Sequence, residues 1–153
     1  MNPTLLCIAR HGETDWNTEK RLQGHVDISL NAMGEAQARS VRPGLAGQVF
    51  AAAYSSDLER AWRTAEIATE ELGIAVSPAP TFRERHYGVY QGLTSAEALA
   101  RHPDVHRHHT ARSLDYDYET GESLLRFAAR VMDGFAELAA RHRGENVLVF
   151  THG

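Results

Sequence analysis

The fold is decided by the stretch Leu5-Leu6-Cys7-Ile8-Ala9-Arg10-His11-Gly12-Glu13-Thr14-Asp15-Trp16-Asn17. It begins as a continuous apolar run, which predicts a strand over residues 4–9 that is buried on both faces. It then changes abruptly to Arg10, His11 and Gly12, as chains do where ligands bind at the carboxyl end of a parallel strand. Arginine beside imidazole favours an anion, phosphate first, and glycine lets the backbone approach it. The alternative is a surface loop with a chance Arg-His pair.

The totals describe one small globular domain. The 153 residues are 42% hydrophobic and 24% charged, which predicts a single domain over residues 1–153. The net charge is −4 and no long basic run occurs, so nothing favours nucleic acid as a partner. We find no apolar segment of membrane-spanning length and no signal peptide. The single cysteine, Cys7, lies in the apolar run, so we expect no internal disulfide and a reducing, cytoplasmic setting.

Apolar stretches and helix-capping residues alternate along the rest of the chain. Besides residues 4–9, short apolar runs predict strands at residues 49–54, 74–77 and 147–150. The caps and stops that predict helices between them are Asn31 with Pro43, Ser56 or Asp57 with Gly73, Thr94 and Glu97 with Pro103, and Ser123 with Gly144. Strands that alternate with helices predict an α/β three-layer sandwich, with a mostly parallel central sheet and helices on both faces.

Two polar segments interrupt this alternation. Residues 12–30 form a long predicted loop, and loops of this length in a small domain are usually functional or disordered. Residues 102–122 are predicted to be a mobile lid or excursion. Its histidines could be a metal cluster, but we interpret them as solvated; they are His102, His106, His108 and His109. The tyrosines of this region suit either substrate contact or ordinary packing; they are Tyr87, Tyr90, Tyr116 and Tyr118.

The first and last strands end alike, in Arg10-His11-Gly12 and Thr151-His152-Gly153. If these strands are parallel neighbours, both histidines lie on the same rim of the sheet. One imidazole could attack phosphorus and the other could donate a hydrogen bond to the phosphoryl oxygens. The alternative is a metal site, but arginines repel cations and clamp phosphate, and no acidic or cysteine ligand lies at metal spacing.

Two further residues suit the same chemistry. Arg60 falls in the first turn of its predicted helix, so its side chain points back toward the rim, where the helix N-terminus also favours an anion. Its alternative is a solvated surface arginine, the role we expect for Arg63. Glu84 is the candidate proton donor, because a phosphate ester leaves poorly as an alkoxide. Its alternative is a solvated carboxylate in a charged loop.

These residues belong to motifs that follow one another along the whole chain. The motifs are Arg10-His11-Gly12-Glu13-Thr14 with Trp16-Asn17, Arg21-x-Gln23-Gly24, Ser55-x-x-Leu58-x-Arg60-Ala61-x-x-Thr64-Ala65, Arg83-Glu84 with Gly88 and Gln91-Gly92, Gly121-Glu122-Ser123, and Thr151-His152-Gly153. In this order, from residue 5 to the last residue, they resemble the histidine phosphatase superfamily, the phosphoglycerate-mutase-like proteins.

The resemblance implies a role for each site residue. His11 would take up the phosphoryl group as a phosphohistidine, and Glu84 would act as general acid on the leaving group and then as base on water. The cationic pocket around the phosphoryl group would consist of Arg10, Arg60, His152 and Asn17. The pocket edge would include Gln23 and Gly24, and we add His25 and His86 as rim candidates. The resemblance implies no metal and no other cofactor, since arginines can neutralise the phosphoryl charge.

The family contains phosphatases and mutases, and the phosphatase branch is favoured here. The 68 positions between Glu84 and His152, together with Gly121-Glu122-Ser123, resemble the shorter phosphatase arrangement. The predicted function is therefore a metal-independent phosphomonoester phosphatase acting on a small phosphorylated metabolite. A phosphoglycerate mutase and a non-catalytic phospho-ligand or protein-binding module are the alternatives. Acidic residues at 115–119 argue against a strongly anionic second group on the substrate.

One departure from the resemblance concerns the end of the chain. Family members normally continue past Thr-His-Gly with a further helix and strand, whereas this sequence stops at Gly153. We therefore expect the domain to lack that C-terminal part, either because the natural protein is longer or because the form is truncated. A truncated form would be less stable and would leave apolar surface on the last strand open. A homodimer with a second copy of the chain is also expected as a partner interaction.

Overall fold

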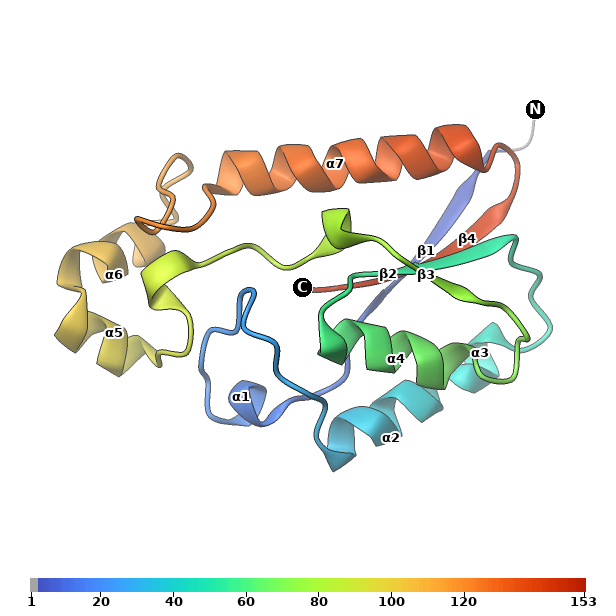
Figure 1. The fold of residues 1–153 in the computed structure, drawn as a ribbon, viewed down its shortest axis with the longest axis horizontal. Helices are drawn as coiled ribbons and strands as arrows, with labels where there is room; N and C mark the ends of the chain where they lie inside the picture. The colour runs from blue at the N-terminus through green and yellow to red at the C-terminus, as the bar shows by residue number, and fades with distance from the viewer. Residues whose placement is uncertain (1–2) are drawn as a thin grey trace.

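The structure is a computed structural model, and it describes residues 3–153 (Figure 1). Within that range the sheet has four strands in the spatial order β1 (Leu5–Arg10), β4 (Asn146–Thr151), β2 (Ala52–Ser55) and β3 (Val76–Pro78). Every neighbouring pair is parallel. The first and last strands of the sequence are therefore neighbours, and the predicted α/β fold is confirmed.

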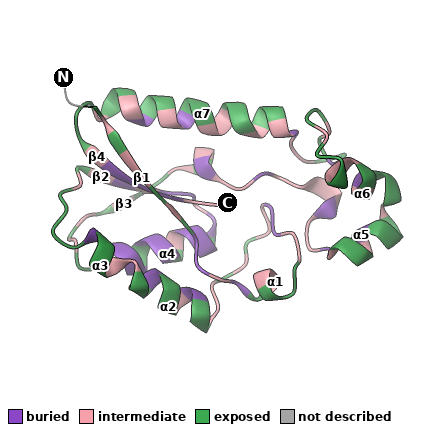
Figure 2. Ribbon diagram, turned by 180° about the vertical axis from the view of Figure 1, so that it is seen from behind, coloured by how far each residue is buried: buried purple, intermediate pink, exposed green. Residues whose placement is uncertain are grey.

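Helices cover both faces of the sheet. Figure 1 shows α7 (Leu124–Arg141) on one side, and α2 (Ala32–Ser40) and α4 (Glu59–Thr69) on the other. The buried residues of β4 divide between the two layers. Val147 and Val149 pack with α7, while Leu148 and Phe150 pack on the α4 side. The continuous apolar run at residues 147–150 is thus a strand buried on both faces, as predicted (Figure 2).

The prediction that the first strand is buried on both faces is wrong. In the described chain β1 has a single neighbour, β4, and lies at the edge of the sheet. Leu5 and Ile8 are 56% and 53% exposed, although Leu6 and Cys7 pack against the two core layers. An apolar run indicates how much side-chain surface a strand can bury, but it does not indicate how many strands lie beside it in the sheet.

The capping residues set most helix boundaries where the sequence predicts them. Asn31 caps α2 through its side chain, and α3 (Arg42–Leu45) restarts the helix after α2 ends at Ser40, with Pro43 in its first turn. Thr94 forms the predicted capping box at α5 (Ser95–Arg101), and Ser123 caps α7. The long loop at residues 12–30 contains one unpredicted helical turn, α1 (Asp15–Thr18).

The cap predicted for α4 is wrong. Its N-cap is Leu58, with no side-chain cap, because Asp57 instead accepts two hydrogen bonds from Arg83, at 2.6 and 2.5 Å. The Ser56 hydroxyl lies 2.8 Å from His152 Nε2, in the site described below. Strand ends differ by a few residues from the predicted ones: β2 begins at Ala52 rather than residue 49.

The interpretation of the histidines in residues 102–122 as solvated is wrong for His106 and His109, while the mobility of the segment stays a prediction. The segment contains α6 (Pro103–Thr110), which packs against α5. The turns η1 (Pro80–Phe82) and η2 (Gly88–Tyr90) precede α5 in the chain. The centre of this region is a second core that contains Tyr90 and Tyr118. His106 and His109 hydrogen-bond the hydroxyls of these tyrosines, at 3.0 and 2.8 Å. The packing role of the tyrosines is thereby confirmed, and the histidines are their partners.

Candidate active site

The site lies where β1 and β4 end side by side. Arg10 pairs with Thr151 in the sheet, and the His11 backbone N–H donates to the Thr151 carbonyl at 3.0 Å. The next residues, His11 and His152, therefore leave the sheet at the same rim. Their imidazole rings lie 5.1 Å apart, centroid to centroid. The predicted meeting of the two histidines thus follows directly from the parallel register.

His11 is fixed in the form that a nucleophile needs. Its Nδ1 lies 2.7 Å from the carbonyl oxygen of Gly12, which can only accept, so Nδ1 carries the proton and Nε2 keeps a lone pair. Burial lowers the pKa of His11 to about 4, and the positive charges of Arg60 and Arg10 act in the same direction. The ring is therefore neutral at neutral pH, with Nε2 free to attack.

Gly12 lines the cavity beside His11 and is also required for packing. A Cβ atom built on Gly12 would lie 2.4 Å from the carbonyl oxygen of Gly34, in the first turn of α2. The backbone N–H of Gly12 donates to Thr64 Oγ1 on α4 at 3.0 Å. The loop that carries His11 is thus held between two helices by a close backbone contact and a buried hydrogen bond.

His152 presents one ring nitrogen to the protein and keeps the other free. Its Nε2 lies 2.8 Å from the hydroxyl of Ser56. Its Nδ1 is buried and has no hydrogen-bond partner among residues 3–153. Burial lowers the pKa of His152, and the charge of Arg60 lowers it further. A buried polar atom without a partner is costly, so Nδ1 is a candidate ligand contact.

Arg60 is fully buried and is not the solvated arginine of the alternative interpretation. It lies in the first turn of α4 and donates to the backbone carbonyls of Gly24 and Val26, at 2.7 and 3.0 Å. Within the described chain it forms no ion pair, and its Nε has no partner. Burial lowers its pKa to about 10, so it remains charged at neutral pH. The charges of Glu84 and Asp27 oppose this shift, but neither carboxylate is in ion-pair contact with Arg60. A buried positive charge with no carboxylate in direct contact favours an anionic ligand.

Arg10 and Asn17 line a cavity of about 180 Å³ together with His11. The Asn17 amide oxygen accepts from the backbone N–H of Thr14 at 3.0 Å, which orients the side chain across the start of α1. The Arg10 guanidinium has no hydrogen-bond or ion-pair partner in residues 3–153. The cavity therefore has a free guanidinium beside the proposed nucleophile.

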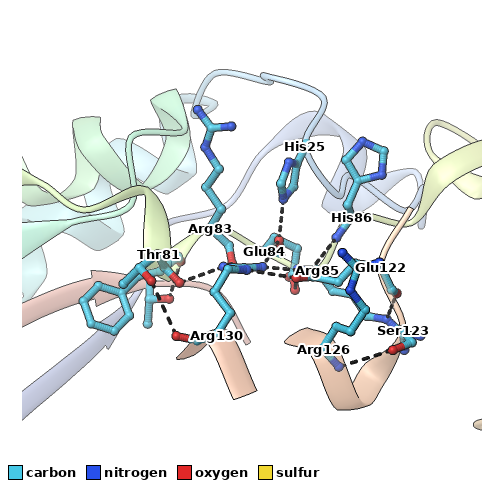
Figure 3. A network of polar contacts seen from close by, with 12 residues as sticks. His25, Thr81, Arg83, Glu84, Arg85, His86, Glu122, Ser123, Arg126 and Arg130 are labelled. Carbon is cyan, nitrogen blue, oxygen red and sulfur yellow. Dashed lines mark hydrogen bonds and ion pairs between the residues drawn. The ribbon is translucent and has the colours of Figure 1, made fainter. Parts of the chain in front are cut away.

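Glu84 is half-buried rather than a freely solvated carboxylate, and burial raises its pKa. The backbone N–H of Arg85 donates to its carboxylate at 2.8 Å, and this bond and the charges of Arg60 and Arg10 oppose the rise. The carboxyl is thus closer to a protonated state than an exposed glutamate. Its main-chain carbonyl accepts from His25 Nε2 at 2.7 Å, so the rim candidate His25 supports the segment that carries Glu84 (Figure 3).

Gln23 and Gly24 lie next to these groups. Gln23 is buried and its amide oxygen has no partner in the described chain. Gly24 has φ +55°, and a Cβ there would lie 2.1 Å from the Gln91 side chain. Its carbonyl holds Arg60. The second rim candidate, His86, packs edge-on against His25 at 4.7 Å.

Motif reasoning missed several residues of the site. Ser56 has a predicted capping role but contacts His152, which lies 96 positions away. Thr64 was part of a quoted motif without an assigned role, and Arg130 had no signal other than its position on the long helix. Contacts of this kind depend on how distant elements pack, and local spacing does not report them.

A metal centre has no ligand cluster in the described residues. Between residues 3 and 153, no group of three or more His, Cys, Asp or Glu side chains is arranged to hold a metal ion. None of the helices in the same range is long and apolar enough to cross a membrane. The groups that converge on the site are two arginines, two histidines and the half-buried carboxyl of Glu84.

The sequence profile of the histidine phosphatase superfamily (branch 1) matches residues 6–153. The chain belongs to this superfamily. The match confirms the resemblance on which the predicted fold and activity depend.

Relatives and solved structures carry both phosphatase and mutase names. Phosphoglycerate mutase-like protein 4 of Arabidopsis thaliana is 38% identical, over 97% of this chain and 66% of that protein. The metal-independent phosphoserine phosphatase of the same plant is 37% identical, over 98% and 64%. The mycobacterial glucosyl-3-phosphoglycerate phosphatase solved with VO3 has a TM-score of 0.84 and 34% identity, over 95% of this chain and 74% of that one. The chain thus spans about two thirds of the length of the two plant relatives.

Proposed function

We propose that this protein is a metal-independent phosphomonoester phosphatase that acts through a phosphohistidine at His11 on a small phosphorylated metabolite. The observation that carries the proposal is the neutral His11 ring, with Nε2 free, beside the unpaired buried charge of Arg60. A nucleophile and a buried cation that is in no ion-pair contact suit a phosphoryl group, which supplies both the electrophile and the negative charge.

In the first half-reaction, His11 Nε2 attacks phosphorus. The nitrogen–phosphorus bond forms as the bond from phosphorus to the ester oxygen breaks. Glu84, whose raised pKa favours the protonated carboxyl, gives its proton to the leaving oxygen, so the product is a neutral alcohol and not an alkoxide. The Nδ1–H bond to the Gly12 carbonyl stabilises the positive charge that develops on the ring.

In the second half-reaction, the Glu84 carboxylate takes a proton from water as the water oxygen attacks phosphorus. The nitrogen–phosphorus bond breaks, inorganic phosphate leaves, and His11 returns to its neutral form. Glu84 thereby regains the proton that it lost. Each half-reaction balances without a metal ion or a redox partner.

The phosphoryl oxygens would be held by the donors that lack protein partners. Arg10 and Arg60 supply fixed positive charge, and Asn17 supplies an amide from the cavity wall. For His152 we propose that the Ser56 hydroxyl donates to Nε2, which leaves a proton on the buried Nδ1 for a phosphoryl oxygen. Gln23 and Gly24 would lie at the edge of this pocket, as the sequence predicts.

The competing assignment within the family is a phosphoglycerate mutase, and the bacterial relatives named 2,3-bisphosphoglycerate-dependent phosphoglycerate mutase, at 35 to 38% identity, make it a specific alternative. We favour hydrolysis because only 68 positions separate Glu84 from His152. A cytoplasmic location, a homodimer and the absence of nucleic-acid and membrane partners stay predictions.

A panel of phosphomonoesters tests the proposal. We expect the purified protein to release inorganic phosphate with a chelator present, and orthovanadate to inhibit it. His11→Asn should reduce release to the uncatalysed level, whereas His102→Asn, outside the site, should leave it unchanged. Faster interconversion of the two phosphoglycerate isomers than phosphate release would favour the mutase. Vanadate binding without turnover of any ester would instead indicate a non-catalytic phospho-ligand module.

A further inference from the structure

The segment that carries Glu84 has little structure of its own. Beyond the turn η1, residues 83–87 belong to no helix or strand, so no regular backbone ladder fixes their carbonyls. Arg130, on α7, reaches across to two of these carbonyls and to one in η1. It donates to the carbonyls of Thr81 at 2.7 Å, Arg83 at 3.2 Å and Glu84 at 3.4 Å (Figure 3). One side chain of a rigid helix therefore holds the strip of backbone that ends at the proposed acid.

Arg130 is itself held in a single orientation. Glu122 accepts from its Nε at 2.9 Å and from its Nη2 at 2.8 Å, the two-point geometry that best defines a guanidinium plane. The Glu122 side chain is only 15% exposed, so solvent screens this pair less than a surface pair. The backbone N–H of Glu122 also donates to the carbonyl of His86 at 2.8 Å. Arg130 thus holds the start of the segment that contains Glu84, and Glu122 holds its end at His86.

The Glu84 carbonyl has a second donor on its other side. His25 comes from the loop that also holds Arg60 through Gly24, and its Nε2 lies 2.7 Å from this carbonyl. Since a carbonyl can only accept, the His25 proton lies on Nε2. The backbone of Glu84 is therefore held between α7 and the 23–26 loop, and its carboxylate is close enough to Arg60, Arg10 and Arg130 for their charges to lower its pKa.

We propose that Arg130, held by Glu122, is a positioning residue for Glu84 in phosphoryl transfer. This inference rests on the proposed function. Arg130 does not touch the substrate; it fixes the backbone from which the acid reaches the leaving oxygen. Its loss frees that backbone and withdraws the proton from the leaving group, while His11 and its cationic pocket keep their geometry. The defect then falls on esters whose alcohol needs a proton to leave.

Paired substrates test this role. We expect Arg130→Met to lower kcat/KM for an alkyl phosphate such as glycerol phosphate by roughly a hundredfold, and for p-nitrophenyl phosphate, whose phenolate leaves without a proton, by only a few fold. Glu122→Gln should show the same pattern more weakly. Arg141→Met, which removes another arginine–glutamate pair of the same helix, should leave both substrates unchanged. The ratio of the two rates does not depend on the fraction of folded protein, so partial unfolding cannot imitate the result.

Glu84→Gln separates this inference from the proposed function. If it impairs the alkyl ester selectively but Arg130→Met lowers both substrates equally, or neither, Arg130 is only structural and the positioning role is overturned. If Glu84→Gln itself shows no preference between the substrates, Glu84 is not the acid, and the positioning role is overturned together with that part of the mechanism. Continued loss of activity in His11→Asn would then leave the phosphohistidine step intact.

Discussion

At the scale of single residues, the charge state of His11 decides whether the site can act. Burial of the ring disfavours the charged imidazolium, and so do the positive charges of Arg60 and Arg10. The Gly12 carbonyl fixes the remaining proton on Nδ1. A protonated ring would have no lone pair on Nε2. The same burial that keeps His11 reactive therefore links the stability of the protein to pH.

The sign of that linkage is fixed by the direction of the pKa shift. The pKa of His11 is lowered from 6.5 to about 4, so between these pH values the unfolded chain binds a proton that the folded protein does not. Stability is lost as the pH falls through this window. Near pH 5 the loss attributable to His11 is about 2 kcal/mol. Urea unfolding should show wild type losing that much more than His11→Asn on going from neutral pH to about pH 5; equal losses would contradict the buried neutral ring.

Motifs identified the charged residues of the site better than their partners. Arg10, His11 and His152 follow directly from two similar strand ends, because parallel neighbours end at one rim. Ser56 shows the limit: a serine before a helix is a good cap by local rules, yet its hydroxyl meets His152. Whether such a serine caps a helix or contacts a distant side chain depends on which residues the tertiary fold places beside it.

At the scale of elements, the loop after β1 is seated against α2 by two glycines. A Cβ on Gly34 would lie 2.1 Å from the Glu13 carbonyl, and one on Gly12 would meet Gly34 in turn. Both contacts are to backbone, which cannot rotate away. Helix α2 therefore sets the position of the segment that follows His11.

Gly34→Ala tests this contact. We expect it to force α2 away from the loop, to lower the free energy of unfolding by about 1–3 kcal/mol, and to reduce kcat through displacement of His11. Gly44→Ala is the matched control, because nothing lies within 4 Å of its added methyl group. That substitution should be neutral or slightly stabilising. Calorimetry and phosphate release check both, and equal behaviour of the two variants would contradict the close approach.

Elements with strong local signals were predictable, and those defined by neighbours were not. The caps at Asn31, Thr94 and Ser123 act through side chains within three positions, so the sequence alone locates these helix starts. The edge position of β1 depends on the strand order, and α6 forms where His109 and its neighbours find tyrosine partners. The sequence predicts such polar residues to be solvated, because it does not show that a tyrosine hydroxyl lies beside them in the fold.

At the scale of the whole molecule, the site joins parts from almost the entire chain. Arg10 comes from β1 and His11 directly follows it, Arg60 comes from α4, Glu84 from the segment after η1, and His152 directly follows β4. The sheet order β1-β4-β2-β3 places the first and last strands together, so the site forms only when the fold is complete. Activity at His11 therefore also tests whether the whole domain has folded.

Trapping the phosphoenzyme tests the central claim most directly. A phosphomonoester with a labelled phosphoryl group is mixed with the protein and quenched in alkali, where phosphohistidine survives, and the label is mapped by mass spectrometry. We predict label on His11 that is lost in acid, no label in His11→Asn, and unchanged label in His102→Asn. Label that persists in His11→Asn, or that maps to another residue, would contradict the assignment of His11 as the nucleophile.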